Sequence, residues 1–358
     1  MKKALIAMSG GVDSSVAAYL MTQAGYECTG CTMKLYDNET ACAAKEKTCC
    51  SLDDIEDARA IAYRLGMPYY VFNFKAEFEQ QVIGKFVDCY RCGRTPNPCI
   101  DCNRYMKFER LLERAAILGC EKVVTGHYAQ IAESAHGLML KRSADPSKDQ
   151  TYVLYMLTQE QLAHIAFPLG GLTKQQVRQI AEEQGFVNAH KRDSQDICFV
   201  PDGDYARVIE HYTGERSEPG EFVDTAGNVI GTHSGLIHYT IGQRRGLGIA
   251  IGKPAYVCGL DPAHNRVIIG TNEDLFTDTC TVSGINWNAG AIPQEPVRCE
   301  AKIRYRHPAQ PASVTFQDAH TAVLKFDTPQ RAITAGQSAV FYDGDWVLGG
   351  GEIVNSSG

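Results

Sequence analysis

Residues 2–15 of the chain read KKALIAMSGGVDSS, an apolar run that ends in glycines and serines. The pattern predicts a strand, a tight turn and the start of an amphipathic helix. A helix that begins directly after a strand points its first N–H groups at one place, which makes an anion-binding site. Gly10 and Gly11 can adopt positive φ there, which lets a phosphate approach the main chain closely. The serines of the stretch add hydroxyl donors.

The turn matches neither of two common phosphate-binding motifs. No lysine follows the glycines, as the G-x-x-x-x-G-K-[ST] loop requires, and the dinucleotide pattern G-x-G-x-x-G is absent here. The string S-G-G-V-D-S instead resembles the signature of the PP-loop ATP pyrophosphatases. That resemblance implies cleavage of ATP to AMP and pyrophosphate, with adenylation of an oxygen of the substrate. The alternative is an ordinary strand–turn–helix with a Ser/Asp cap.

Length and composition narrow the class of protein. The 358 residues permit two or three domains, and 44% apolar with 22% charged residues is typical of a soluble globular protein. No apolar run is long enough to span a membrane, and the apolar run after the first lysines is too short for a signal peptide. We therefore expect a cytoplasmic protein. The net charge of −7 excludes a uniformly basic nucleic-acid binder but leaves local basic patches open.

The first ~200 residues alternate predicted strands and helices, which favours a doubly wound parallel sheet. Ligands of such sheets bind outside the carboxyl ends of the strands. The Ser9 loop, Met33 and Gly126-His127 fall at such ends, and we expect them to line one pocket. Later in the chain, short β-branched runs predict a small mixed central domain and a C-terminal antiparallel β-barrel. The predicted domains are residues 1–202, 203–277 and 278–358.

The periodicity of apolar residues, and the capping residues and glycines between the apolar segments, predict individual helices and strands. Thr173 and Gln176 form a predicted capping box for a helix that ends at Gly185. The other expected helices cover residues 52–65, 77–90 and 104–118. The expected strands of the sheet cover residues 27–33, 69–74 and 122–125, and those of the barrel residues 297–304, 312–316, 322–326 and 338–342. Residues 37–51 are expected to form a loop.

Cysteine is abundant, with ten of the fourteen cysteines in the first 120 residues. In a reducing compartment this favours metal, cluster or redox chemistry over structural disulfides. Two C-x-x-C pairs at residues 89–102 are typical of a zinc site. A helix expected to start just after Cys102 would lower the thiol pKa, which suits a nucleophile and a metal ligand equally. Cys198 taken alone is more often a small buried hydrophobe.

Six motifs occur in order along the chain: SGGVDSS at 9–15, GRTPNPCIDCN at 93–103, TGHYA at 125–129, KDQ at 148–150, DSQDICF at 193–199 and IGQRRGL at 241–247. Together they resemble the tRNA-specific 2-thiouridylases, the MnmA/TrmU family, over essentially the whole chain. That family places sulfur on C2 of the wobble uridine, U34, in tRNAs for Lys, Glu and Gln. The resemblance implies ATP and Mg²⁺ as cofactors and the anticodon arm of tRNA as partner. It also implies a cysteine desulfurase or sulfur-relay protein as donor, and nothing in the sequence demands more than a monomer.

The resemblance also assigns roles to residues. The ATP-binding set would be Ser9, Gly10, Gly11, Val12, Asp13, Ser14, Ser15, Met33 and Gly126, with Asp13 assisting magnesium and pyrophosphate release. The catalytic cysteines would be Cys102, as the nucleophile, and Cys198, as the persulfide carrier. The target base would meet Asn97, Pro98 and Cys99. The tRNA contacts would be His127, Lys148, Asp149, Gln150, Arg304, Tyr305 and Gln337.

The chemistry agrees with these roles. The C2 oxygen of uridine is a poor leaving group, and adenylation converts it into AMP, which leaves readily. A sulfur nucleophile can then attack C2. U34 must leave the anticodon stack to reach such a site, and an aromatic residue such as Tyr305 can stack on RNA bases.

The chain departs from the commonest family pattern at two places, which leaves two mechanisms open. Cys99 stands where many members have Asp, and Gln195-Asp196 where many have Thr-Gly. In one mechanism Cys198 carries a persulfide and Cys102 releases the sulfur by forming a disulfide bond with it. In the other, Cys99, Cys102 and Cys198 hold a [4Fe-4S] cluster with one open iron that presents a sulfide.

The remaining cysteines and the function of the whole chain each leave more than one hypothesis open. Cys49, Cys50, Cys89 and Cys92 could hold a zinc ion or stay unligated thiols. Besides a tRNA thiolase, the chain could be a PP-loop adenylating enzyme with a different acceptor. It could also be a non-catalytic metal-binding protein that binds tRNA.

Overall fold

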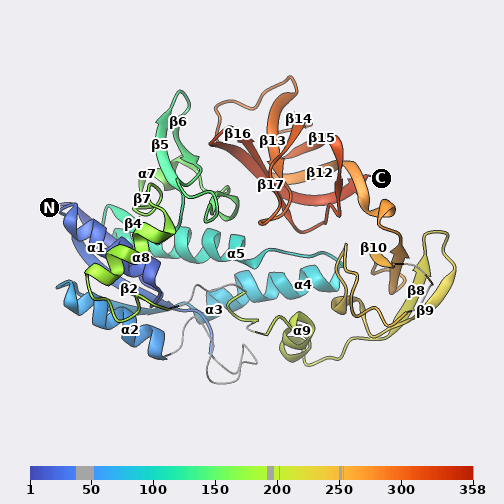
Figure 1. Ribbon diagram of the computed structural model, residues 1–358, viewed down its shortest axis with the longest axis horizontal. Coiled ribbons are helices and arrows are strands. Elements are labelled where there is room, and N and C mark those ends of the chain that lie inside the picture. Colours follow the sequence, from blue (N-terminus) through green and yellow to red (C-terminus); the bar gives the residue numbers. More distant parts are fainter. Residues whose placement is uncertain (38–51, 192–196, 201, 250–251, 253, 358) are drawn as a thin grey trace. The chain divides into compact units, whose positions relative to one another are not determined.

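The computed structural model describes residues 1–37, 52–191, 197–200, 202–249, 252 and 254–357. The expected loop at 37–51 therefore lies almost entirely outside the described residues. The chain forms two compact units (Figure 1). Unit 1 comprises residues 1–83, 98–203 and 345–348, and unit 2 comprises residues 84–97, 204–344 and 349–358. Each unit is described below by itself.

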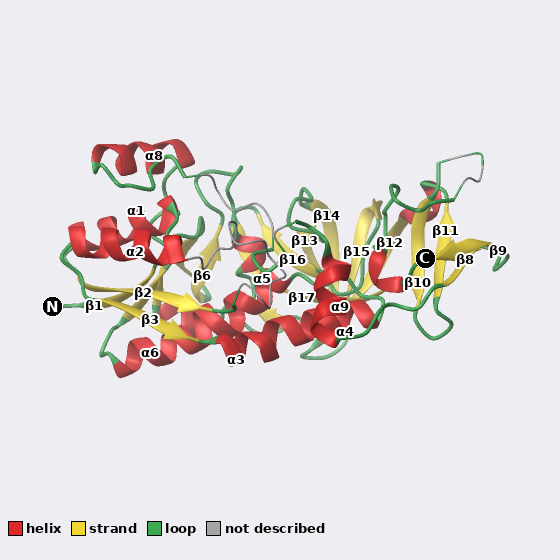
Figure 2. Ribbon diagram, turned by 90° about the horizontal axis from the view of Figure 1, so that it is seen from below, coloured by secondary structure: helices red, strands yellow, loops and turns green. Residues whose placement is uncertain are grey.

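Unit 1 is built on a five-stranded parallel sheet with the strand order β3-β2-β1-β4-β7. The strands are β1 (Lys3–Ala7), β2 (Glu27–Lys34), β3 (Tyr69–Asn73), β4 (Lys122–Val124) and β7 (Ile165–Ala166). The helices include α1 (Val12–Gln23), α2 (Leu52–Arg64), α3 (Lys75–Phe78), α6 (Leu111–Ile117) and α8 (Lys174–Glu183). Figure 2 shows α1, α2 and α8 on one side of the sheet and α3 and α6 on the other. The prediction of a doubly wound parallel sheet is confirmed.

The core of unit 1 follows from the apolar periodicity of these elements. Ile6 of β1 and Val124 of β4 are fully buried, as are Val16 and Ala17 of α1. This packing fixes the first turn of α1 at the carboxyl end of the central strand β1. The predicted capping box of α8 is present, since Thr173 and Gln176 each accept from the other's backbone N–H.

Two long helices expected between residues 77 and 118 differ from the prediction, and the first of them runs from unit 1 into unit 2. The first is divided into α3, a π-helical stretch (Glu79–Gly84) and α4 (Lys85–Arg91). The second begins earlier than expected, as α5 (Pro98–Asp101) and a π-helical stretch (Cys102–Arg110) precede α6. Proline is favoured in the first helical turn because it has no N–H to leave unpaired. The expectation of a helix start after Cys102 was therefore wrong, and Cys99 is the cysteine in the first turn.

Unit 1 also contains elements that the sequence analysis missed. A hairpin of β5 (Gln130–Ser134) and β6 (Gly137–Lys141) follows β4, and Trp346 pairs with Lys141 at its edge. A 3₁₀ turn (Thr151–Val153) and the helix α7 (Gln159–Ala163) lead from this hairpin to β7.

Unit 2 combines a small mixed domain with a closed barrel. The mixed part contains α9 (Tyr205–Thr213), β8 (Gly220–Asp224), β9 (Val229–His233), β10 (Tyr256–Asp261) and β11 (Arg266–Gly270), with 3₁₀ turns at Leu236–His238 and Glu273–Leu275. Its strand order is β10-β11-β8-β9, around a core that includes Phe222, Val257 and Val267. None of the described helices of either unit has the length and apolar character to cross a membrane.

The barrel strands are β12 (Phe276–Trp287), β13 (Val297–Lys302), β14 (Gln310–Phe316), β15 (Thr321–Arg331), β16 (Ser338–Asp343) and β17 (Trp346–Ser357). They follow the order β12-β15-β14-β13-β16-β17, and antiparallel pairing of β12 with β17 closes the barrel. The prediction of a C-terminal antiparallel barrel is confirmed, although β12 and β17 were not expected as strands.

A buried histidine lies directly after β4 in unit 1. The His127 ring is 7% exposed and packs against Phe108 and Phe167, with ring centroids 5.9 and 5.8 Å away. Its Nε2 lies 3.3 Å from Lys107 Nζ, and its Nδ1 lies 2.6 Å from Thr125 Oγ1. An ammonium group can only donate, so Nε2 accepts and Nδ1 carries the proton. Burial lowers the pKa of His127 well below its usual range, and the Lys107 charge lowers it further.

The neutral state of His127 predicts a loss of stability in acid. The unfolded chain binds a proton at this histidine below about pH 6.5, whereas the folded chain does not, so stability falls as the pH falls. Between pH 7.5 and 5.5 this residue should cost about 1.4 kcal/mol of unfolding free energy. Urea unfolding at both pH values should show that difference in the parent chain and lose it in His127→Gln. Equal pH dependence of the two proteins would contradict the assignment.

Candidate active site

The loop between β1 and α1 has the backbone shape of an anion site. Gly10 has φ 73° and Gly11 has φ −89°. Gly10 thus uses the positive φ open to glycine, whereas Gly11 is the N-cap of α1 and takes the extended conformation usual there. A Cβ on Gly10 would lie 2.8 Å from the Cα of Asp54, so a side chain has no room at that position.

Hydrogen bonds of three serines hold the backbone of this loop. The Ser14 and Ser15 hydroxyls donate to the Gly11 carbonyl oxygen at 3.0 and 3.1 Å. The Ser9 N–H donates to Ser14 Oγ at 3.2 Å. These bonds hold the turn in one shape before any ligand binds, which lowers the ordering cost of binding.

The carboxyl ends of β1, β2 and β4 share one edge of the sheet, because β1 pairs with both neighbours in parallel. Met33 lies near the end of β2, and Gly126 follows β4. A Cβ on Gly126 would come within 2.8 Å of Asp13 C and Ser14 N, so this glycine permits close packing on the first turn of α1. The sequence-predicted ATP residues from three separate segments therefore meet at the same edge.

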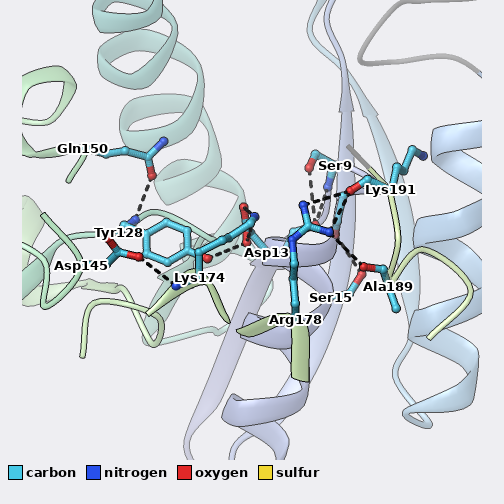
Figure 3. A network of polar contacts seen from close by, with 12 residues as sticks. Ser9, Asp13, Ser15, Tyr128, Asp145, Gln150, Lys174, Arg178, Ala189 and Lys191 are labelled. Atoms are coloured by element: carbon cyan, nitrogen blue, oxygen red, sulfur yellow. Dashed lines mark hydrogen bonds and ion pairs between the residues drawn. The ribbon is translucent and has the colours of Figure 1, made fainter. Parts of the chain in front are cut away.

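Asp13 is the centre of a polar network (Figure 3). Its carboxylate accepts from the Lys174 ammonium at 2.7 and 2.8 Å and from the Tyr128 hydroxyl at 2.8 Å. The Lys174 side chain is only 11% exposed, and its Nζ lies 5.8 Å from the centroid of the Tyr128 ring. The fold thus supplies from α8 the lysine that the loop itself lacks.

The sequence analysis missed Lys174. The capping box placed this residue at the first position of α8, but nothing in the local pattern connected it with a loop more than 150 residues earlier. Asp145 accepts the Lys174 N–H at 3.0 Å and thereby fixes the start of the helix. That backbone hydrogen bond and one from the Ser147 side chain lower the pKa of Asp145.

Residues of the KDQ motif form hydrogen bonds that hold Tyr128 and the backbone next to this network. Gln150 Oε1 accepts the Tyr128 N–H at 2.8 Å, and the Gln150 N–H donates to the Tyr128 carbonyl oxygen at 2.9 Å. The Asp149 carboxylate accepts from the Thr151 hydroxyl at 2.7 Å. The Lys148 N–H donates to the Asp145 carbonyl oxygen. The tRNA contacts assigned to these residues by resemblance stay predictions, and so does that of the buried His127.

Cys99, Cys102 and Cys198 all belong to unit 1. Cys99 is exposed, and Cys102 and Cys198 are partly exposed. The Tyr36 hydroxyl donates to the Cys198 carbonyl oxygen at 2.7 Å. The next residue, Phe199, is buried with its ring edge against Phe78. These contacts fix the backbone at Cys198 against the segment that follows β2.

Among the described residues, no three His, Cys, Asp or Glu side chains form a group that could hold a metal ion. The described part of the chain includes Cys99, Cys102 and Cys198, so the three thiols do not converge as a cluster would require. Cys89 is buried and Cys92 is exposed near the end of α4. Cys49 and Cys50 lie outside the described residues, as do residues 193–196 of the DSQDICF motif.

Burial separates reactive from unreactive thiols. Desolvation raises the pKa of the buried Cys28 to about 11, and that of the buried Cys280 and Cys299 to about 12. Thiols with such pKa values remain protonated at neutral pH and are poor nucleophiles. The exposed and partly exposed cysteines at 99, 102 and 198 are the better candidates for sulfur chemistry.

The remaining predicted tRNA residues lie in unit 2. The Arg304 guanidinium donates to the carbonyl oxygens of Ile241 and Ala332 and to Thr334 Oγ1. Gln337 Nε2 donates to the Thr95 carbonyl oxygen at 2.7 Å, next to the segment that holds Asn97. These two side chains make internal contacts in this structure.

Tyr305 differs from its neighbour Arg304, because its side chain is 38% exposed. The Lys302 ammonium lies 5.9 Å from the centroid of its ring. An exposed aromatic ring beside a cation provides a surface that can stack on a base. The roles of Arg304, Tyr305 and Gln337 at tRNA stay predictions.

Comparison with known proteins covers nearly the whole chain. The family model described as the tRNA methyl transferase HUP domain matches residues 2–202. The models described as the tRNA methyl transferase PRC-barrel domain and the aminomethyltransferase β-barrel domain match residues 206–271 and 277–353. These ranges do not test the domain limits predicted at residues 202 and 277, which stay predictions.

Two relatives illustrate the similarity. The tRNA-specific 2-thiouridylase MnmA of Lachnoclostridium phytofermentans is 50% identical over 356 residues, which are 99% of this chain and 100% of that protein. The protein of the same name from Clostridioides difficile is 49% identical over 357 residues, 99% of each. With this identity over nearly full length, and with a loop, a sheet and a barrel of the expected kinds, the chain belongs to the MnmA family of tRNA-specific 2-thiouridylases.

Proposed function

We propose that this chain is an ATP-dependent tRNA-uridine 2-sulfurtransferase that replaces the C2 oxygen of U34 with sulfur in tRNAs for Lys, Glu and Gln. The observation that carries the proposal is the pairing of Asp13 with Lys174 at the first turn of α1, in the same unit as two accessible cysteines. Membership of a family whose relatives bear the 2-thiouridylase name supports the same substrate.

The loop and Lys174 would act on ATP. The N–H groups at the start of α1 favour a bound phosphate, and the Lys174 ammonium adds the positive charge that stabilises a pyrophosphate leaving group. Mg²⁺ prefers carboxylate oxygens, and the Asp13 carboxylate lies in the first turn of α1, next to the loop. Asp13 would therefore be the residue that holds Mg²⁺, which supplies charge neutralisation to the phosphates.

The proposed reaction begins with adenylation of the uridine and ends with transfer of sulfur. The C2 oxygen of the uridine attacks the α-phosphorus of ATP, and pyrophosphate leaves. The terminal sulfur of a persulfide on Cys198 attacks C2, and AMP leaves with the former oxygen. Cys102 thiolate then attacks Sγ of Cys198, which releases 2-thiouridine and forms a Cys102–Cys198 disulfide. An external dithiol reduces the disulfide, and a cysteine desulfurase or sulfur-relay protein restores the persulfide.

The iron–sulfur mechanism has less support. It needs the thiols of Cys99, Cys102 and Cys198 on one cluster, and the described residues do not gather them. We therefore derive no step through a cluster. Exposure of the Cys99 side chain in the first turn of α5 is instead compatible with a position beside the target base.

Substitution of Asp13 tests the proposed nucleotide site. Asp13→Asn keeps the shape of the side chain but removes the charge opposite Lys174. We expect tRNA-dependent conversion of ATP to AMP to fall by about 10²–10³-fold, the usual effect of losing one charge-stabilising group. Asp224→Asn, at an exposed turn of unit 2, is the control and should retain activity. Undiminished AMP formation by Asp13→Asn would contradict the proposed role.

Substitution of the catalytic cysteines separates adenylation from sulfur transfer. Cys102→Ser and Cys198→Ser should lose 2-thiouridine formation, measured by retardation of the tRNA on a mercury-containing gel, while the fold persists. Cys120→Ser alters a partly exposed thiol of the same unit and should remain active.

Cys99→Ser distinguishes the two mechanisms. Activity of this variant without iron supports the persulfide relay, whereas joint loss of iron and activity in the Cys99, Cys102 and Cys198 variants supports a cluster. Full thiolation by Cys198→Ser with a persulfide donor would exclude the relay. AMP formation without any thiolation by the parent enzyme would point to a different acceptor.

A further inference from the structure

A second lysine contacts the nucleotide loop, from the segment that follows α8. Lys191 Nζ donates to the Gly10 carbonyl oxygen at 3.3 Å. It also forms ion pairs with two carboxylates of α2, Asp54 at 2.6 Å and Asp57 at 2.8 Å. In Figure 3, Lys174 and Lys191 lie on opposite sides of the start of α1. Neither the sequence motifs nor the proposed reaction assigns a task to Lys191.

The Gly10 carbonyl receives a second donor from the same segment. Asn188 Nδ2 donates to it at 3.0 Å and to Ser15 Oγ at 2.9 Å. Asn188 is 3% exposed, and its Oδ1 has no hydrogen-bond partner among the described residues. Buried polar atoms are rarely left unpaired. At Asn188 the structure leaves Oδ1 without a partner, while the amide nitrogen donates to the Gly10 carbonyl oxygen and to Ser15 Oγ.

These two donors determine which way the loop's main chain faces. In a trans peptide the carbonyl of one residue and the N–H of the next point in opposite directions. Since the Gly10 carbonyl points at Lys191 and Asn188, the Gly11 N–H points away from them. The positive φ of Gly10 permits this orientation. The peptide between Gly10 and Gly11 is therefore held with its donor on the side opposite the 188–191 segment.

Lys191 also compensates the negative charge of Asp54 and Asp57 beside the loop. The main chain of Asp54 contacts Gly10, and the Asp54 side chain is only 13% exposed. A buried carboxylate is weakly screened and repels a nearby polyanion. Burial by itself lowers the pKa of Lys191. The hydrogen bonds to Asp54 and Asp57 raise it by more, so the net shift of the Lys191 pKa is upward. The ammonium therefore persists and compensates the two carboxylates.

We infer that Lys191 is a positioning residue of the ATP site: it orients the Gly10–Gly11 peptide and neutralises Asp54 and Asp57, so that the triphosphate can bind. This inference rests on the proposed function, because it takes ATP as the anion. It adds to that function a residue that acts through the loop without touching the reacting atoms.

The test compares the ATP dependence of AMP formation among charge variants. Lys191→Met leaves the carboxylates uncompensated and should raise the KM for ATP by about tenfold or more, with a smaller effect on kcat. Lys191→Arg keeps the charge and should stay within about threefold of the parent. The triple variant Lys191→Met/Asp54→Asn/Asp57→Asn removes all three charges and should recover most of the lost affinity, whereas a merely structural lysine would not be rescued in this way.

A matched control is available in the same unit. Lys122 is a partly buried lysine at the amino end of β4, and its ammonium donates to the Ala163 carbonyl oxygen. Lys122→Met should leave the KM for ATP unchanged. Thermal unfolding of each variant and equilibrium dialysis with ATP accompany the kinetics, so that a loss of folding is seen separately from a loss of affinity.

The possible outcomes are distinct. A parent protein that neither binds ATP nor forms AMP would overturn the proposed function itself. An active parent with an unchanged ATP KM in Lys191→Met would overturn the inference alone. A triple variant that folds but binds ATP as weakly as Lys191→Met would overturn the charge compensation that the inference assigns to Lys191.

Discussion

Lys174 and Asp13 form the ion pair that joins α8 to the first turn of α1, and the geometry of the proposed nucleotide site depends on it. Lys174 is nearly buried, and a buried ammonium requires a partner for its charge. Asp13 supplies that partner with both carboxylate oxygens, and Tyr128 adds a hydroxyl to the same group. The pair thus ties three segments from different parts of the chain to one helix terminus.

The loop between β1 and α1 is consequently held from two sides. Lys174 lies at the beginning of α8 and faces Asp13, whereas Lys191 follows the helix and contacts the Gly10 carbonyl. A stretch of 18 residues, from Lys174 to Lys191, therefore supplies two lysines that lie near the loop. This arrangement explains how an anion site can work without a lysine in its own motif, and it makes α8 part of the site.

The sulfur chemistry proposed for this chain depends on a different physical distinction, that between buried and accessible thiols. Desolvation keeps the buried thiols of Cys28, Cys280 and Cys299 protonated. Cys102 and Cys198 are partly exposed in the unit that holds the loop. The hydrogen bond from Tyr36 and the packing of Phe199 hold the backbone at Cys198 in a defined place, as a sulfur carrier requires.

The sequence by itself determined the fold class and the nature of the loop, because both depend on local patterns: strand and helix periodicity, the glycines at 10 and 11, and the capping box at Thr173. It did not locate the helix start at Pro98, the closing strands of the barrel or the extended φ of Gly11. Only the tertiary structure decided which charges meet. Lys174 and Lys191 carry no local signal, since their partners Asp13, Asp54 and Gly10 are more than 130 residues away along the chain. Packing of the helices on the sheet, and the cost of burying an unpaired charge, bring them together.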